Sequence, residues 1–273
     1  MERHTRITHI EQAVCMDMVR AVGPAIQTRL GLDACYHHGA LVLRAEHLPH
    51  PLHNRTVGPL CGSHPGRPPT EKVIAGLLER FAARDISRFF IQIPKDSSHD
   101  DARQALTNLG LKRYHRDWHE LVRGRGPVPA APPHIQIRPA RAEDAHPMGE
   151  LFANAFDLPS AAAPLYAALV TRPGWHAFIA TIGNQTAGAG LLFIEGEAAF
   201  LAAGATHPDM RRRGVQGALM TARIHKALHN GCDLIMSNTG EAVRDQPNPS
   251  YHNMLRCGFA QTSATENWVL PLP

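Results

Sequence analysis

The run Arg211-Arg212-Arg213-Gly214 is the stretch in which residue type and spacing most directly indicate chemistry. Three arginines precede a glycine, Gly217 follows three residues later, and an apolar pattern then begins. Arginine binds phosphate oxygens through charge-assisted hydrogen bonds. Glycine permits a tight turn and lets the backbone approach a ligand closely. We therefore interpret the run as a loop that binds an anion.

A helix is expected directly after this loop. Four apolar residues at i, i+3, i+4 and i+7 predict a helix from about 216 to 230, ended by Gly231: Val215, Ala218, Leu219 and Ala222. The unpaired N–H groups and the dipole of its first turn favour an anion. The loop is neither a Walker loop nor G-x-G-x-x-G. A basic helix start on the surface is the simpler alternative, but three arginines at that end are unfavourable without an anion.

The remaining pattern divides the chain into two parts of similar element order. Residues 124–134 hold four prolines and two glycines, which favours a linker. Strands are expected before the arginine loop at 177–182, 186–196 and 198–207, and after the helix at 233–238 and up to Leu270, with a short helix at 250–257. In the first part, strands are expected at 40–48, 53–62, 89–94 and 111–122, and helices at 70–85 and 100–110, with Thr70 as an N-cap.

Arg211-x-x-Gly214-x-Gln216 resembles the R/Q-x-x-G-x-G/A signature of the GNAT acetyltransferases. The segment GATHP resembles the end of that family's fourth strand, DLIMSNTGE its fifth strand, and NPSYHNMLRCGF the helix and turn that follow. The resemblance spans Ile135 to Leu270, and the first half resembles a degenerate copy. It implies a mixed α/β (α+β) fold of two GNAT-like domains, 1–125 and 135–273, each a largely antiparallel twisted sheet flanked by helices, joined by a linker at 126–134.

The resemblance also implies acetyl-CoA as cofactor and transfer of its acetyl group to an amine by direct attack in a ternary complex. The residues expected to bind the cofactor come from the fourth strand, the loop, the fifth strand and the short helix. They are Ala205, Thr206, His207, Arg211, Arg212, Arg213, Gly214, Val215, Gln216, Gly217, Ala218, Asn238 and Asn253. Backbone N–H groups around Ala205 to His207 are expected to stabilise the oxyanion.

Two positions depart from the family pattern. Gln216 stands where glycine or alanine is usual, and Met254 stands where many members have the tyrosine that protonates the departing thiolate. Tyr251, nearly one helical turn earlier, is the substitute we consider as acid, and Glu241 is the better placed candidate base. The turn carboxylates of Glu195 and Glu197, and His207, are weaker candidates for the base. A non-catalytic acyl-CoA-binding regulator is therefore the alternative function.

The first copy is not expected to bind CoA. The segment CGSHPGRPPTEK takes the place of the phosphate loop, and two of its prolines remove N–H donors that a phosphate would need.

The composition limits which partners, metals and cellular locations are expected. The net charge is +4 without dense basic blocks, so nucleic acid is not expected as a partner. The expected acceptor is a small-molecule or peptide amine, and the protein is expected to be a monomer or a homodimer. Five scattered cysteines, no signal peptide and no apolar span of membrane length predict a cytoplasmic protein. No metal is expected, because His47, His50 and His53 need not converge and the pair His225 and His229 lacks the zinc-protease glutamate.

Overall fold

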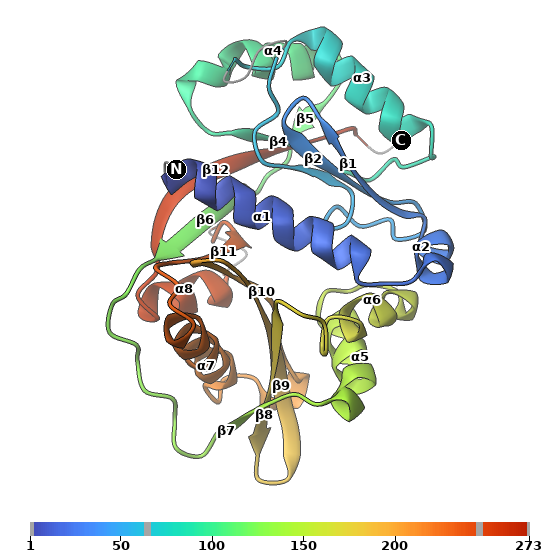
Figure 1. The fold of residues 1–273 in the computed structure, drawn as a ribbon. Helices are drawn as coiled ribbons and strands as arrows, with labels where there is room; N and C mark the ends of the chain where they lie inside the picture. Colours follow the sequence, from blue (N-terminus) through green and yellow to red (C-terminus); the bar gives the residue numbers. More distant parts are fainter. Residues whose placement is uncertain (1–2, 63–66, 244–247, 272–273) are drawn as a thin grey trace. The chain divides into compact units, whose positions relative to one another are not determined.

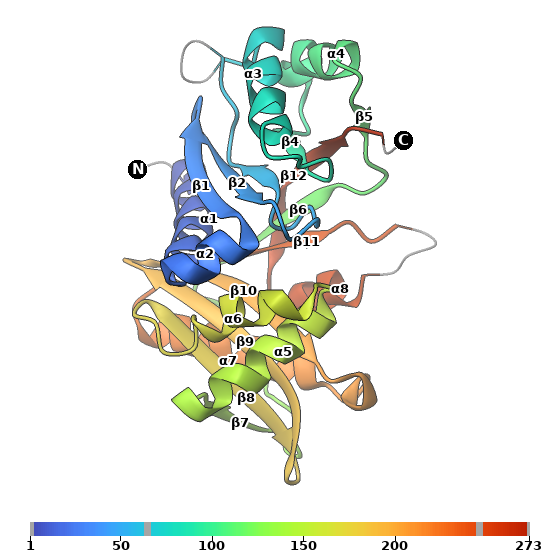
Figure 2. The same ribbon diagram turned by 90° about the vertical axis from the view of Figure 1, so that its right-hand side faces the viewer.

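The chain forms two compact units in the computed structural model, which describes residues 3–62, 67–243 and 248–271. Unit 1 comprises Met1–Val19, Gly23–His119 and Ser263–Pro273, and unit 2 comprises Arg20–Val22 and Glu120–Thr262. Figures 1 and 2 follow the chain through both. In the described ranges, no helix is both long and apolar enough to cross a membrane.

Unit 1 contains a small antiparallel sheet. Its strands lie in the order β1 (Leu32–His37), β2 (Ala40–Ala45) and β3 (Arg55–Val57). The first two form a hairpin in which His38 and Gly39 both have positive φ, the conformation that a tight two-residue turn requires. The third strand is buried along its whole length.

Helices and a second group of strands complete unit 1. The helices are α1 (Arg3–Arg20), α2 (Pro24–Leu30), α3 (Glu71–Ala82) and α4 (Asp100–Asn108), with a 3-10 turn η1 at Ser97–His99. Strands β4 (Ile91–Pro94) and β5 (Lys112–Arg113) pair antiparallel with β12 (Ala260–Val269). The apolar faces of α3, α4, β2 and β4 share one core, in which the Phe81 and Phe89 rings stack at 4.3 Å. Thr70 caps α3, as predicted: its Oγ1 accepts from the Val73 N–H at 3.4 Å.

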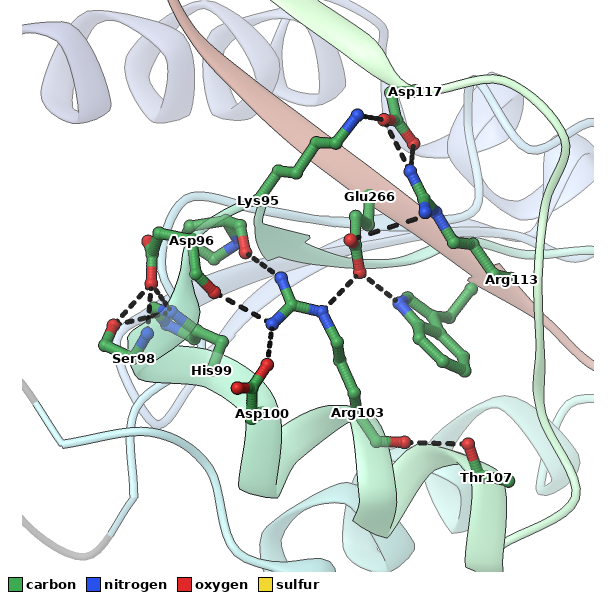
Figure 3. Close-up of polar contacts among 12 residues, drawn as sticks. Lys95, Asp96, Ser98, His99, Asp100, Arg103, Thr107, Arg113, Asp117 and Glu266 are labelled. Atoms are coloured by element: carbon green, nitrogen blue, oxygen red, sulfur yellow. Dashed lines mark hydrogen bonds and ion pairs between the residues drawn. The ribbon is translucent and has the colours of Figure 1, made fainter.

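A charged cluster anchors β12 in unit 1 (Figure 3). Two buried carboxylates form its centre. The Glu266 carboxylate accepts from the Arg103 Nε at 3.0 Å and from the Trp268 indole N–H at 3.2 Å. The Asp117 carboxylate accepts from both Arg113, at 2.7 and 2.9 Å, and Lys95, at 2.8 Å. Hydrogen bonds from these cations hold the pKa of Asp117 below its usual range despite burial, which raises it.

Unit 2 is built on a mixed sheet. Its strands lie in the order β6, β11, β10, β9, β8 and β7, and residues 260–262 of β12 lie beside β6. Their bounds are β6 Trp118–Arg123, β7 Gln136–Pro139, β8 Trp175–Ile182, β9 Gln185–Glu195, β10 Ala198–Thr206 and β11 Leu234–Gly240. The pairs β7–β8, β8–β9 and β9–β10 are antiparallel, whereas β10 and β11 are parallel.

Helices cover both faces of this sheet (Figures 1 and 2). One face carries α5 (Ala145–Ala155) and α6 (Ala163–Ala167), preceded by 3-10 turns at Ala142–Asp144 and Ser160–Ala162. The other face carries α7 (Val215–His229), packed on β8, β9 and β10, and α8 (Pro249–Arg256). Both helices contribute to the same apolar cluster as β6, β9, β10 and β11.

The proline-rich segment expected to be a linker packs along α7. The Thr221 Oγ1 donates to the Pro129 carbonyl at 3.1 Å, and the Arg123 guanidinium donates to the carbonyl groups of Gly126 and Pro127. The segment therefore has fixed contacts within unit 2. The predicted domain bounds, 1–125 and 135–273, stay a prediction beside the observed units.

Candidate functional site

The loop between β10 and α7 brings the chain back to the start of a helix. A 3-10 turn at Pro208–Met210 follows β10. Arg212 and Gly214 then have φ values of 62° and 87°, in the left-handed region that favours glycine. Gly214 is the N-cap of α7 and provides no side-chain hydrogen bond to the helix.

The first turn of α7 is therefore uncapped. Its first helical hydrogen bond runs from the Ala218 N–H to the Gly214 carbonyl at 3.0 Å. The preceding N–H groups of Val215, Gln216 and Gly217 have no acceptor inside the helix. A Cβ added at Gly217 would meet nothing within 4 Å, so the space beside this turn is open.

Three positively charged residues directly precede this open turn in the chain. Arg211, Arg212 and Arg213 are all exposed, and the first turn of α7 contains no acidic residue. The helix dipole adds partial positive charge at the same end. Open space, unpaired N–H groups and three guanidinium groups fit a phosphate or pyrophosphate.

The strands β10 and β11 diverge next to this turn. Their parallel pairing covers Ala198 to Phe200 opposite Leu234 to Met236. One further link follows, from the Ser237 hydroxyl to the Leu201 carbonyl at 2.8 Å. From Leu201 to Thr206, buried residues of β10 alternate with half-exposed ones, and the last three residues of β11 are half-exposed. The separated strand ends thus offer backbone groups to a ligand.

The predicted backbone donors at the end of β10 differ in availability. The His207 N–H donates to the Ala187 carbonyl at 2.9 Å, so it is already used. The His207 side chain is 48% exposed, and its Nδ1 lies 3.7 Å from the Asp209 carboxylate. Ala205 is buried and Thr206 is half-buried.

Helix α8 is fixed to β11 through Asn248. The Asn248 side chain accepts from the N–H groups of Ser250 and Tyr251, at 3.0 and 3.4 Å, and so caps the helix. The same side chain donates to the Thr239 hydroxyl at 2.8 Å and to the Gly240 carbonyl. Residues 244–247 of the intervening loop, including Pro247, lie outside the described residues.

Gln216 links the first turn of α7 to α8. Its amide donates to the Ser250 hydroxyl at 3.0 Å and accepts from the Asn253 amide at 2.7 Å. The Arg256 guanidinium donates to the other end of the Asn253 amide at 3.1 Å. The residue that departs from the family signature therefore holds Asn253, a predicted cofactor-binding residue, beside the uncapped turn.

The two positions considered for the thiolate acid lie in different surroundings. Met254 is 5% exposed and packs with Cys257 and Phe259 in the core. Tyr251 is half-buried, and its hydroxyl donates to the Gln261 side chain at 3.0 Å.

The carboxylates considered as bases lie at different ends of the sheet. Glu241 follows β11 directly and is half-exposed, as is Asn238 within that strand. Glu195 and Glu197 are exposed in the turn before β10. Nine residues of strand separate them from the loop, roughly 30 Å at 3.3 Å per residue. That distance places them away from the end of the sheet that carries the arginine loop.

The histidines do not form a metal site in the described ranges. His53 is buried, whereas the His47 side chain is 56% exposed. Among the residues that the structure describes, no group of three His, Cys, Asp or Glu side chains is arranged to hold a metal ion.

Solved structures share this fold over most of the chain. A GCN5-related N-acetyltransferase from Kribbella flavida aligns with a TM-score of 0.62 at 14% identity, covering 97% of this chain and 96% of that one. A tandem GNAT protein from the clavulanic acid biosynthesis pathway aligns with a TM-score of 0.57 at 17% identity, covering 84% and 77%. A GCN5-related N-acetyltransferase from Sphaerobacter thermophilus aligns with a TM-score of 0.58 at 13% identity, covering 87% and 75%.

The sequence comparison is more local. No relative among curated proteins matches the chain. The profile of the acetyltransferase (GNAT) family matches residues 143–259, from the 3-10 turn before α5 to the Gly-Phe turn after α8. This range contains the separated strands, the arginine loop and the uncapped helix. The family model thus identifies a GNAT domain at residues 143–259, and the solved structures show that the fold is shared over most of the chain.

Proposed function

We propose that the protein is an acetyl-CoA-dependent N-acetyltransferase whose cofactor site lies in unit 2. The observation that supports this most strongly is the uncapped first turn of α7, open at Gly217 and next to three exposed arginines. A pyrophosphate supplies the acceptors that this turn lacks. The separated ends of β10 and β11 suit the extended arm that connects the pyrophosphate to the thioester.

The residues proposed to hold acetyl-CoA are those of the first turn of α7 and of the separated ends of β10 and β11, together with one residue of α8. The loop and first turn, residues 211–218, bind the phosphates. Ala205 and Thr206 on β10 and Asn238 on β11 lie along the opening, and Asn253 lies on α8 beside Gln216. When bound, acetyl-CoA supplies an acetyl group activated as a thioester.

In the proposed reaction, the neutral nitrogen of an acceptor amine attacks the thioester carbonyl carbon in a ternary complex. A C–N bond forms, the C–S bond breaks, and the amine proton leaves to a base. Glu241 is the candidate base, directly or through water, because it follows β11 directly. Tyr251 is the candidate acid that returns a proton to the departing sulfur.

Unit 1 is proposed not to bind CoA. Its helix α3 begins with a side-chain cap from Thr70, and Pro68 and Pro69 precede the cap. The cap already occupies the Val73 N–H. Residues 63–66 of the corresponding loop lie outside the described residues.

The acceptor is proposed to be a small-molecule or peptide amine, with no nucleic acid or membrane involved. The cytoplasm as location and a monomeric or homodimeric state stay predictions from the sequence.

One observation favours a second candidate function. Met254 is buried in the core at the position of the usual tyrosine acid, and it has no proton to donate. A protein that binds acyl-CoA and regulates without transferring the acyl group is consistent with that substitution.

Calorimetry and thermal shift with acetyl-CoA test the cofactor, with acetyl-pantetheine as the matched ligand that lacks the pyrophosphate. We expect acetyl-CoA to bind and to raise Tm, and acetyl-pantetheine to bind much more weakly. CoA release over a broad panel of amines then separates the two functions. Turnover on any amine supports the enzyme, binding without turnover supports the regulator, and absence of acetyl-CoA binding contradicts both.

A further inference from the structure

Arg223 on α7 is a buried cation that the proposed mechanism does not use. It is 2% exposed. Its Nε donates to the Leu219 carbonyl one helical turn earlier, at 3.1 Å. Its Nη1 donates to two strand carbonyls, that of Leu191 on β9 at 3.2 Å and that of Ala203 on β10 at 3.1 Å.

These two carbonyls lie where the pairing of β9 and β10 is irregular. Leu201 pairs with Leu192 and Gly204 pairs with Gly190, so two residues of β10 stand opposite Leu191 alone. This is the arrangement of a β-bulge, which bends a strand and re-aims its backbone groups. The guanidinium thus satisfies carbonyl groups at the bulge.

Two glycines make room for the guanidinium. A Cβ at Gly190 would lie 2.9 Å from the Arg223 Nε, and a Cβ at Gly204 would lie 3.1 Å from an Nη atom. Glycine inside a strand often marks a bulge or a close approach. Here both glycines border the same side chain, so the site is built around Arg223.

The bond to Ala203 fixes the direction of the next N–H group. In a trans peptide unit, C=O and N–H point in opposite directions, and the described chain contains no cis peptide bond. Because the Ala203 carbonyl points at Arg223, the Gly204 N–H points away from it. Gly204 is half-exposed and lies in the part of β10 that follows the pairing with β11.

Arg223 is also a cation without a carboxylate partner in the described part of the chain. Its hydrogen bonds go to three backbone carbonyls. Burial lowers the pKa of its guanidinium to about 10, which leaves it protonated at neutral pH. A positive charge in a poorly screened environment favours negative charge that develops nearby.

We propose that Arg223 is a positioning residue for acetyl transfer: it holds the β10 bulge so that the Gly204 N–H points at the thioester carbonyl, and its charge polarises that carbonyl from behind the strand. This inference rests on the proposed function of unit 2. It assigns a task to a residue that does not itself touch the substrate.

Infrared difference spectroscopy with acetyl-CoA carrying ¹³C at the acetyl carbonyl tests the proposal. A polarised carbonyl absorbs at lower frequency than the free thioester. We expect a downshift in the wild-type complex, its loss in Arg223→Met, and a smaller downshift in Arg223→Lys, which keeps the charge but loses the planar fork. Lys226→Met removes a charge from the same helix and is expected to leave the downshift unchanged.

The outcomes distinguish this proposal from the proposed function. If the wild type does not bind acetyl-CoA, the proposed function fails. If it binds and shows the downshift, but Arg223→Met binds with the same downshift, only the role of Arg223 is overturned. Should Arg223→Met not fold, the comparison of Arg223→Lys with the wild type decides: a smaller downshift supports the role, and an identical one overturns it.

Discussion

Both units contain a parallel pair of strands that separates after a short contact, and the two pairs are filled differently. In unit 1, Arg55 of β3 and Phe90, the residue before β4, form an isolated parallel bridge, and the Thr56 hydroxyl accepts from the Gln92 N–H at 2.8 Å. In unit 2, β10 and β11 pair over three residues, and a serine hydroxyl makes the last link. Both contacts are short and parallel and are followed by a hydroxyl hydrogen bond, which the Thr56 hydroxyl accepts in unit 1 and the Ser237 hydroxyl donates in unit 2.

Side chains close the pair in unit 1. The Gln12 amide, from α1, donates to the carbonyl groups of Val57 and Gly39 at 3.0 and 2.9 Å. The Arg55 guanidinium donates to the Gln92 side chain at 2.9 Å and lies 4.7 Å from the Trp118 ring centroid. All three residues of β3 are buried, whereas the ends of β10 and β11 contain half-exposed residues. The two pairs therefore differ in how far side chains from the rest of the chain cover the strand backbone.

The two helix starts differ in the same way. Helix α3 has a Thr70 cap, which accepts from the Val73 N–H, and Glu71 in its first turn, whose negative charge is favourable at the positive end of the dipole. Helix α7 has neither, and its nearest charges are positive. Unit 1 thus supplies from its own chain a side-chain cap that the start of α7 lacks.

The largest effect is expected from removing the charges beside α7. The double variant Arg211→Ala/Arg213→Ala should weaken acetyl-CoA binding about 100-fold, about 2.7 kcal/mol, because each of these solvent-exposed arginines would lose a charge-assisted hydrogen bond near the lower end of the range of roughly 1.5–3 kcal/mol. Calorimetry measures the change. Arg141→Ala removes an exposed charge elsewhere in unit 2 and should leave the affinity unchanged. If the double variant bound acetyl-CoA as tightly as the wild type, the difference between the starts of α3 and α7 would have no role in cofactor binding.

The next effect concerns the closure of the pair in unit 1. Gln12→Ala leaves the Val57 and Gly39 carbonyls without this donor and should lower the free energy of unfolding by about 1–3 kcal/mol. Denaturant titration gives the value, and the exposed Gln104→Ala should change it little. Acetyl-CoA affinity should stay as in the wild type. If Gln12→Ala bound a second equivalent of acetyl-CoA, the side chains that fill the strand pair of unit 1 would be the only feature that prevents unit 1 from binding acetyl-CoA.

A pH effect follows from His53 in the interior of unit 1. Burial, then the charges of His50 and Arg55, lower the pKa of His53 to about 3. Between about pH 3 and 6.5 the unfolded chain therefore binds a proton that the folded chain does not. The contribution of neutral His53 to the free energy of unfolding is therefore fully present above pH 6.5. It falls as the pH drops below that value, by at most about 1.4 kcal/mol per pH unit. Unfolding free energies measured from pH 7 to pH 5 should show this slope in the wild type and in His47→Asn, and a smaller slope in His53→Gln.

The smallest effect concerns the cap of α3. Thr70→Ala should lower the unfolding free energy by about 1 kcal/mol, and Thr70→Ser should restore most of it, because serine keeps the accepting oxygen. Thermal unfolding compares the three proteins. A Thr70 variant that lowers acetyl-CoA affinity without lowering stability would contradict the assignment of a structural role to the start of α3 and a cofactor-binding role to the start of α7.

Strong local patterns made much of the fold predictable. The helix expected at 216–230 is α7, Val215–His229, because its apolar face and terminal glycine are encoded locally. The single strand expected at 111–122 is wrong: β5 and β6 are separate, because the Asp117 side chain bonds to Arg113 and Lys95 between them. The strand expected at 53–62 shortens to β3, three residues long. Helix α1 was not predicted, since charged residues on its exposed side obscure its buried face.

The candidate site was predictable where residue type alone defines it. The arginine loop and its glycine could be recognised, because glycine at positive φ and a basic helix start are local properties. Arg223 could not, because its partners are backbone carbonyls on two other strands. The glycines at 190 and 204 inside predicted strands were the available signal. The role of Gln216 could likewise not be predicted, because it depends on hydrogen bonds to Ser250 and Asn253, which lie on a helix far away in the sequence.

Strand β12 has a consequence for how the protein is made. Residues 265–268 of this strand pair with β4, and Glu266 is buried among the cations of unit 1. A ribosome completes residues 3–119 long before it reaches these positions. Until residue 268 has left the exit tunnel, β4 lacks its partner and Arg103 lacks the Glu266 carboxylate. The unit that begins first in synthesis can therefore reach its final structure only after the sequence of the other unit has been translated.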